Sequence, residues 1–229
     1  MPTYKYPRPS VTVDAVVFGL DGAVLKVLLV ERILAPFKGR WALPGGFVHM
    51  NESLEDAVAR ELMEETNVKS AHLEQLYTFG EPKRDPRGRV ISVAYFALVK
   101  AVDHATSAGS DAAAARWVDI DLILRPFRNS DFESLAFDHT TIIQLAITRL
   151  RSKIKYTPIG FDLLGEKFTL GELQSLYEAI LSQKLDKRNF RKKILDMGAV
   201  EKTGEIRSTR PPSTLYRFSK GFSKKSFEI

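Results

Sequence analysis

The chain has 229 residues and a net charge of +6, and 44% of its residues are hydrophobic, which is enough for a packed core. It contains no cysteine, and this excludes disulfides, thiol chemistry and zinc sites built on cysteine. No apolar run reaches membrane-spanning length and the first residues lack the apolar core of a signal peptide, so we expect a cytoplasmic protein with no membrane partner.

The chain begins with a predicted β-hairpin. Residues 11–18 alternate and are rich in β-branched side chains, residues 20–22 (LDG) are typical of a turn, and residues 25–30 are apolar again. Residues 40–46 (RWALPGG) predict a short strand that leads into a glycine loop.

A helix is predicted after the glycine loop. Ser53 is expected to be its N-cap, with Asp56 three residues later. Three apolar residues at i, i+4 spacing form the stripe that is expected to face the core, and these are Leu54, Val58 and Leu62.

Three glutamates lie on one face of this helix. Glu61, Glu64 and Glu65 stand at i, i+3 and i+4, so their carboxylates converge and repel one another. A hard divalent cation such as Mg²⁺ would neutralise them best, because it prefers a few carboxylates together with phosphate oxygens. Arg60 could orient one carboxylate or contact a phosphate. The alternative interpretation is the solvated acidic end of a surface helix.

The order of these residues is more specific than the acidic cluster alone. Gly46 is followed after five residues by Glu52, and after seven more by RELMEE at residues 60–65, which closely resembles the Nudix box. Asn67 stands where that pattern has glycine. The glycine would end the helix in the left-handed conformation, and asparagine is the next most tolerated residue there, so we interpret the change as conservative.

The resemblance to the Nudix box implies hydrolysis of a nucleoside diphosphate linked to another group. ADP-ribose is the leading substrate, with AMP and ribose phosphate as products. Mg²⁺, or Mn²⁺ in its place, would neutralise phosphate charge and lower the pKa of an attacking water. The residues implied in catalysis are Glu52, Arg60, Glu61, Glu64 and Glu65, of which Glu61, Glu64 and Glu65 would hold the metal. Gly45 and Gly46 would shape the phosphate loop, and the general base stays open between a box glutamate and a later carboxylate.

The elements after the box complete the first domain. Strands are predicted at residues 73–79, 90–99 and 114–118, and a helix at residues 137–150. Strands on both sides of a helix predict an α/β (α+β) fold with a mixed sheet covered by helices, which agrees with the α/β/α sandwich that the Nudix box implies.

Residues 79–89 (FGEPKRDPRGR) form a predicted ligand-binding loop. Pro82 follows the box by fourteen residues, as in ADP-ribose-specific relatives. Arg84, Arg87 and Arg89 could contact phosphate or ribose. The alternative is an ordinary polar hairpin tip.

Other aromatic and histidine side chains give weaker signals. Stacking on adenine competes with a structural role for Tyr4, Tyr6 and Phe37. The histidines lack metal-ligand spacing and are interpreted as ordinary surface or core residues, and these are His49, His72, His104 and His139.

The charge is divided unevenly along the chain. Residues 151–229 hold 17 basic and 9 acidic residues, a net charge of +8, whereas residues 1–150 hold 17 and 19, a net charge of −2. We therefore predict a first domain at residues 1–152, a packed interdomain segment at 153–167 and a second domain at 168–229. The basic second domain favours a polyanionic partner.

The second domain is predicted to be a winged helix-turn-helix. Thr169 and Glu172 form a capping box that begins one helix, and Asp186 caps a second, basic helix. A hairpin of residues 200–206 and 215–218 follows as the wing. Phe190, Ile194 and Met197 are expected to point inward on the second helix. The residues predicted to contact DNA are Lys187, Arg188, Asn189, Arg191 and Lys192 on that helix and Arg207 and Arg210 on the wing.

The Nudix box combined with the segment FTLGELQSLYEAIL…LDKRNFRKKILDMG at residues 168–198 resembles the Nudix-related transcriptional regulators. That family controls NAD metabolism or pentose utilisation and senses ADP-ribose or sugar ligands. Many of its members carry a degraded box, whereas this box is intact and favours retained hydrolysis. We expect a ligand-responsive regulator that binds double-stranded operator DNA as a symmetric dimer. The alternative is a Mg²⁺-dependent ADP-ribose pyrophosphatase whose C-terminal domain only dimerises or covers the active site.

Overall fold

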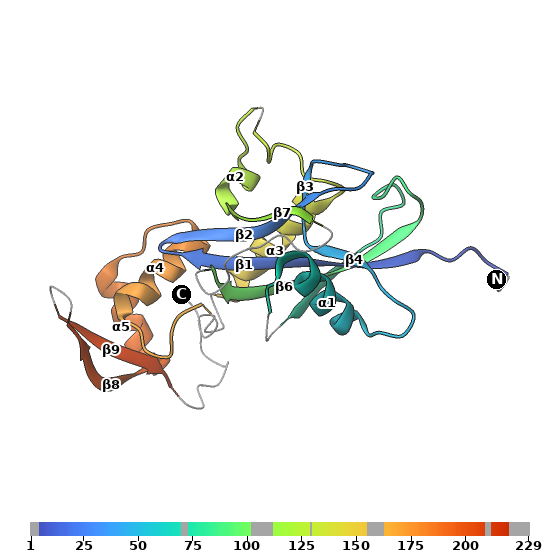
Figure 1. The fold of residues 1–229 in the computed structure, drawn as a ribbon. Coiled ribbons are helices and arrows are strands. Elements are labelled where there is room, and N and C mark those ends of the chain that lie inside the picture. The colour runs from blue at the N-terminus through green and yellow to red at the C-terminus, as the bar shows by residue number, and fades with distance from the viewer. Residues whose placement is uncertain are drawn as a thin grey trace. The chain divides into compact units, whose positions relative to one another are not determined.

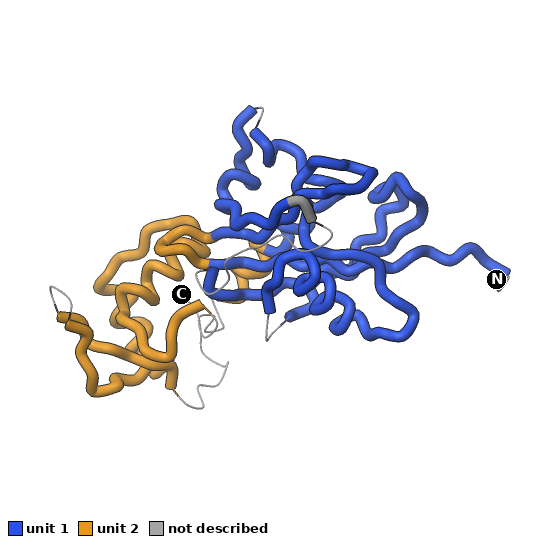
Figure 2. Tube along the Cα trace, viewed as in Figure 1, with its two compact units in different colours: residues 1–19, 26–146 blue, residues 20–25, 147–229 orange. Residues whose placement is uncertain are grey.

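The chain divides into two compact units. The computed structural model describes residues 5–69, 73–101, 112–128, 130–154, 163–208 and 212–219. The first unit comprises residues 1–19 and 26–146 and the second residues 20–25 and 147–229 (Figure 2). In the chain, the first unit ends within helix α3 (His139–Lys153), whereas the sequence predicts the end of the first domain at residue 152. Much of the predicted interdomain segment lies outside the described residues.

The first unit is built on a seven-stranded mixed sheet with the order β3-β2-β1-β6-β5, in which β4 pairs with β1 and β7 with β2 (Figure 1). The predicted hairpin is confirmed, and it spans β1 (Ser10–Asp21) and β2 (Val24–Arg32). The remaining strands are β3 (Trp41–Ala42), β4 (Gly45–Phe47), β5 (Glu74–Phe79), β6 (Val90–Lys100) and β7 (Ala112–Asp119).

The core of this unit has two layers because β1 is buried on both faces. Val13, Ala15 and Val17 pack against α1 (Leu54–Thr66), while Val16 and Phe18 are buried on the opposite face. Figure 1 shows α1 in front of the sheet and the first half of α3 behind it. Burial on both faces explains why β1 reads as a nearly continuous apolar run.

The ends of α1 follow the sequence prediction. Ser53 is the N-cap, and its side chain accepts a hydrogen bond from the backbone N–H of Asp56 at 3.1 Å. Asn67 has a φ of 57° and donates its N–H to the carbonyl of Met63 at 3.0 Å. The expected left-handed end at asparagine is therefore confirmed.

Two short elements were not predicted. The segment around the glycine loop forms both β3 and β4, with Pro44 between them, where the sequence predicts a single strand. Helix α2 (Ile120–Leu124) is capped by Asp119, which accepts from the N–H of Asp121. Five residues are too few to show a helical period, so this helix leaves no clear pattern in the sequence.

The second unit contains the predicted winged helix-turn-helix, which is confirmed. Its elements are α4 (Leu170–Leu181), α5 (Lys187–Asp196), β8 (Val200–Arg207) and β9 (Ser213–Phe218). The capping box of Thr169 and Glu172 is present, and Asp186 caps α5. Tyr177 of α4 meets Phe190 of α5 edge to face at 5.3 Å, which fixes the two helices against each other. Among the helices described, none is long and apolar enough to cross a membrane.

Candidate functional site

Arg60 of α1, the helix that carries the three box glutamates and is called the acidic helix below, forms hydrogen bonds with three carboxylates. Nε and Nη2 of Arg60 donate to the two carboxylate oxygens of Glu52 at 3.0 and 2.7 Å. Nη1 donates to Glu61 at 2.8 Å and to Glu64 at 3.1 Å. The hydrogen bonds from Arg60 lower the pKa of Glu52 to about 2. A single guanidinium thus neutralises part of the charge of three carboxylates.

The glycine loop is needed because the helix approaches it closely. Gly45 donates its N–H to Oε2 of Glu65 at 2.9 Å. A Cβ on Gly46 would lie 2.3 Å from Oε1 of Glu61, so no other residue would leave this carboxylate in place. The pairing of β4 with β1 positions both glycines against α1.

The carboxylates that face the loop resist ionisation. Burial, together with the nearby charges of Glu61 and Asp14, raises the pKa of Glu65 to about 8, although the hydrogen bond from the Gly45 N–H opposes this shift. Burial also raises the pKa of Glu61. Within the described part of the chain, no three acidic or histidine side chains are arranged to hold a metal ion as they stand. Arg60 bonds two of the predicted ligands, and the third, Glu65, bonds the Gly45 N–H.

We predict that Glu65 destabilises the metal-free protein as the pH rises. Its folded pKa of about 8 exceeds the ordinary value of 4.5, so the folded state binds the proton more tightly than the unfolded state. The contribution of protonated Glu65 to the free energy of unfolding is therefore complete below pH 4.5 and is lost as the pH approaches 8. In metal-free buffer, the melting temperature of the wild type should therefore fall relative to that of Glu65→Gln between pH 6 and pH 8. Parallel curves for the two proteins would show that Glu65 has an ordinary pKa.

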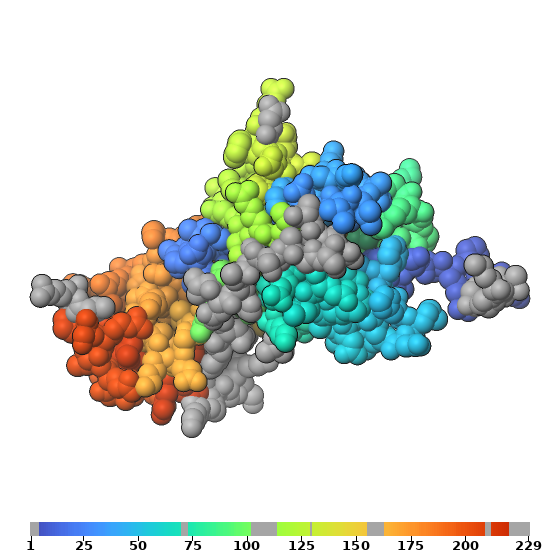
Figure 3. Space-filling view, viewed as in Figure 1, coloured from blue at the N-terminus to red at the C-terminus, as the bar shows by residue number. Residues whose placement is uncertain are grey.

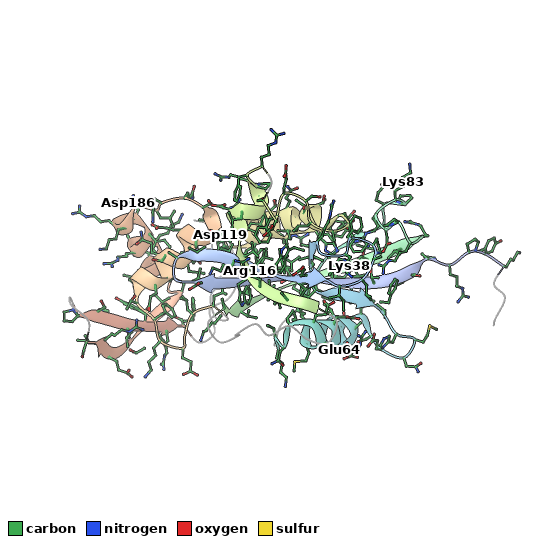
Figure 4. The ribbon with its side chains drawn as sticks, turned by 45° about the horizontal axis from the view of Figure 1, so that its top comes forward. Lys38, Glu64, Lys83, Arg116, Asp119 and Asp186 are labelled. Carbon is green, nitrogen blue, oxygen red and sulfur yellow. The ribbon has the colours of Figure 1, made fainter. Side chains whose placement is uncertain are left out.

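A cavity of about 410 Å³ lies in the first unit beside the acidic helix. The predicted residues that line it are Gly45, Gly46, Arg60, Glu61, Glu64, Glu65, Arg84 and Arg87. Figure 4 labels Glu64 on α1 and Lys83 on the loop between β5 and β6 that supplies the two later arginines. Glu52, Pro82 and Arg89 are not part of the lining, and Arg89 donates to the carbonyl of Gly80 at 2.7 Å.

The floor of the cavity is a buried polar network. Nε and Nη2 of Arg84 bond both oxygens of Asp138 at 2.9 and 2.6 Å, and Nη2 also lies 3.4 Å from Asp14. Asp14 accepts a hydrogen bond from the hydroxyl of Ser92. Arg84 is thus occupied by protein carboxylates and holds the β5–β6 loop in place.

His139 joins this network in its neutral form. Nδ1 accepts from the backbone N–H of Leu43 at 2.8 Å, which leaves the proton on Nε2, 3.4 Å from Asp14. Complete burial lowers the pKa of His139. The sequence gives no reason to assign this histidine to a site, because its partners lie far away in the chain.

An aromatic and cationic wall closes one side of the cavity. The guanidinium of Arg87 lies 4.9 Å from the ring of Phe47 and 5.4 Å from that of Phe137, and Asp85 binds it through both carboxylate oxygens. Although burial opposes it, the hydrogen bonds from Arg87 lower the pKa of Asp85. Arg32 stacks on Phe137 at 4.8 Å. Arg87 is therefore held with its orientation fixed while part of it stays exposed.

The remaining candidates in this unit are spread widely. Phe37 is not part of the lining but packs on Phe137 at 4.9 Å. Tyr6 is exposed, in an N-terminal segment that stands away from the rest of the unit (Figure 3). His49 lines the cavity mouth. Tyr4, His72 and His104 lie outside the described residues.

The basic helix of the second unit presents its charges to solvent. Phe190 and Ile194 are buried, whereas Lys187, Arg188, Asn189 and Lys192 are exposed. Met197, which was expected to point inward, is half-buried. The helix therefore offers one polar, cationic face that suits a phosphate backbone.

Two arginines, Arg191 and Arg207, differ from this pattern. Arg191 is half-buried, and its Nε has no hydrogen-bond partner among the described residues. Arg207 ends β8 and donates to Glu172 of the capping box at 2.6 Å, so in this structure it faces α4 as well as the wing. Arg210 lies outside the described residues.

Comparisons with known proteins agree with this division into two parts. Residues 8–137 match the NUDIX domain, and residues 160–218 match the NrtR DNA-binding winged helix domain. The chain is 37% identical to an ADP-ribose pyrophosphatase of Methanocaldococcus jannaschii over 61% of its length and 73% of that protein. Nudix hydrolases generally use a divalent metal ion.

Among the matches that cover almost the whole chain are a repressor and a solved protein–DNA complex. The ADPR responsive transcriptional repressor NtrR of Acinetobacter baylyi is 38% identical over 93% of this chain and 84% of its own length. The crystal structure of Shewanella oneidensis NrtR complexed with a 27mer DNA has 35% identity and a TM-score of 0.76, and the match covers 96% of this chain and 97% of that one. The chain therefore belongs to the NrtR family, in which a NUDIX domain precedes an NrtR DNA-binding winged helix domain.

Proposed function

We propose that this protein is a transcription regulator that binds operator DNA through its winged helix and ADP-ribose through its Nudix domain. One observation carries the proposal: a single chain combines a cavity lined by an intact Nudix box with an exposed basic helix in a winged helix fold. The similarity to the A. baylyi repressor over most of both chains supports it. Regulation follows if ligand-bound and ligand-free states differ in their affinity for DNA.

Arg87 is the cation of the cavity that is best placed for a phosphate group. It lines the cavity, and Asp85 and two aromatic rings fix its orientation. Its Nη1 donates to none of the described residues, whereas Arg84 is committed to Asp138 and Asp14. A fixed guanidinium loses little entropy when it binds an anion. We assign phosphate recognition to Arg87 and a supporting role to Arg84.

The box residues fit a divalent cation, which we propose to be Mg²⁺. Glu61 and Glu65 resist ionisation where they lie, and a cation would relieve that cost. Hard oxygen ligands from a few carboxylates suit Mg²⁺. When bound, the ion would neutralise the pyrophosphate and supply a water of lowered pKa. Arg60 would keep its bidentate contact with Glu52 and so retain its position beside the ion.

We also propose that the domain hydrolyses ADP-ribose, since every charged position of the box is filled and Arg60, Glu61, Glu64 and Glu65 line one cavity. The reaction would release AMP and ribose phosphate. A slow hydrolase could still act as a sensor, because DNA binding responds to the occupancy of the cavity and turnover only sets how long the ligand stays.

The winged helix would engage one half of an operator, so we propose a symmetric dimer on a palindromic site. An electrophoretic shift assay with DNA from upstream of the protein's own gene should give a specific complex that weakens with rising salt. Addition of ADP-ribose should change the fraction of DNA bound, whereas AMP alone should not. If the fraction of DNA bound did not change on addition of ADP-ribose, the proposal that the Nudix domain is a sensor would be contradicted.

The second candidate function is an ADP-ribose pyrophosphatase without a role at DNA. The intact box and the 37% identity to the M. jannaschii enzyme favour it. Rapid ADP-ribose turnover together with equal affinity for operator and unrelated DNA would select this function over the regulator.

A further inference from the structure

One polar side chain in the cavity wall lacks a partner. Thr12 of β1 is only 6% exposed and lines the cavity. Its hydroxyl oxygen is shielded from solvent and has no hydrogen-bond partner among the described residues. A buried hydroxyl normally finds a partner, because leaving it unpaired costs more than a hydrogen bond gains. Because Thr12 belongs to the cavity wall, a group of the ligand would supply the missing partner once the side chain turns toward the cavity.

The local geometry keeps this part of the wall open. Thr12 and Asp14 lie two apart on β1, so both face the same side of the sheet. Their register partners on β4 are Phe47 and Gly45. Gly45 places no side chain over Asp14, where a Cβ would come within 3.0 Å of Oδ1. Because Gly45 has no side chain, β4 leaves the space over Asp14, beside Thr12, uncovered.

The charges select the kind of ligand group. Asp14 already accepts from Ser92 and lies close to Arg84 and His139. Of these two neighbouring side chains on β1, Thr12 is therefore the one whose hydroxyl has no partner among the described residues. The carboxylate of Asp14 would repel a phosphate at this position. A neutral hydroxyl can both donate to and accept from a threonine hydroxyl. The part of the cavity wall formed by Thr12 and Asp14 therefore suits a sugar hydroxyl, while the phosphates of the ligand would lie toward Arg87.

We propose that Thr12 is a specificity-determining residue that hydrogen-bonds a ribose hydroxyl of the ligand. This inference rests on the proposed function, because it assumes that ADP-ribose enters this cavity. Threonine and valine have nearly the same shape, so Thr12→Val removes the hydroxyl alone. Thr12→Ser keeps the hydroxyl and removes only a methyl group.

Calorimetric titration of the full-length protein with ADP-ribose tests the inference. Thr12→Val should bind about tenfold more weakly than the wild type, the worth of one hydrogen bond, and Thr12→Ser should stay within about threefold. Repeating the titration with ADP assigns the contact: a loss that persists points to the adenosine ribose, and a loss that vanishes points to the terminal ribose. Equal binding by wild type and Thr12→Val, or equal losses in both variants, would overturn the inference.

A second measurement separates binding from folding. Without ligand, Thr12→Val removes an unpaired buried hydroxyl, so its melting temperature should equal or exceed that of the wild type. A lower melting temperature would mean that the hydroxyl is already paired within the protein, and the inference would fail. Failure of the wild type itself to bind ADP-ribose would instead contradict the proposed function.

Discussion

Exchange of Arg188 and Lys192 for glutamate should weaken operator binding by about a hundredfold, since each such contact contributes roughly 1–3 kcal/mol. Both side chains are exposed on α5, on the face opposite its buried residues. The dependence of affinity on salt should also flatten, because fewer phosphate contacts release fewer counterions. Fluorescence anisotropy with labelled operator at several salt concentrations measures both effects.

A matched variant separates the site from the total charge. Lys38 and Lys83 are exposed in the first unit and are labelled in Figure 4. Exchange of both for glutamate alters the net charge by the same amount but should leave operator binding within about twofold. Equal losses of operator affinity in the two double variants would contradict the assignment of α5 as the DNA-binding element.

Replacement of Glu65 by glutamine should reduce ADP-ribose turnover by about a hundredfold or more. Glutamine keeps an oxygen that can accept from Gly45, so the loop should stay in place while the negative charge is lost. The release of AMP in the presence of Mg²⁺, followed by chromatography, gives the rate. Operator binding without ligand should be unaffected, because the change lies in the other unit.

Glu133 provides the comparison for this experiment. It is exposed and is not part of the cavity lining, so Glu133→Gln makes the same chemical change away from the site. Its turnover should match that of the wild type. If Glu65→Gln kept full turnover, the assignment of Glu65 as a metal ligand would be wrong.

The local parts of the fold were predictable from the sequence. The caps at Ser53, Thr169 and Asp186 and the left-handed end at Asn67 depend on residues within a few positions of each other. The placement of Glu61, Glu64 and Glu65 beside the same cavity follows from helical spacing in the same way. Such features need no knowledge of tertiary structure.

The cavity floor could not be predicted because its contacts join distant segments. Arg84 and Asp138 are 54 positions apart, and Leu43 and His139 are 96 positions apart. The one available signal was Asp14, a lone carboxylate within an apolar, β-branched strand. A charge at a buried position requires a partner, but the sequence does not identify that partner.

The bonding of Arg60 has a consequence for how the protein responds to its surroundings. Since this residue already compensates three acidic side chains, an incoming ion replaces an existing counterion and does not have to organise a loose loop. The acidic helix should therefore remain folded in the presence of a chelator. Removal of the metal would stop hydrolysis in the cavity but leave the structure of the cavity intact. Loss of metal would then leave the Nudix domain folded.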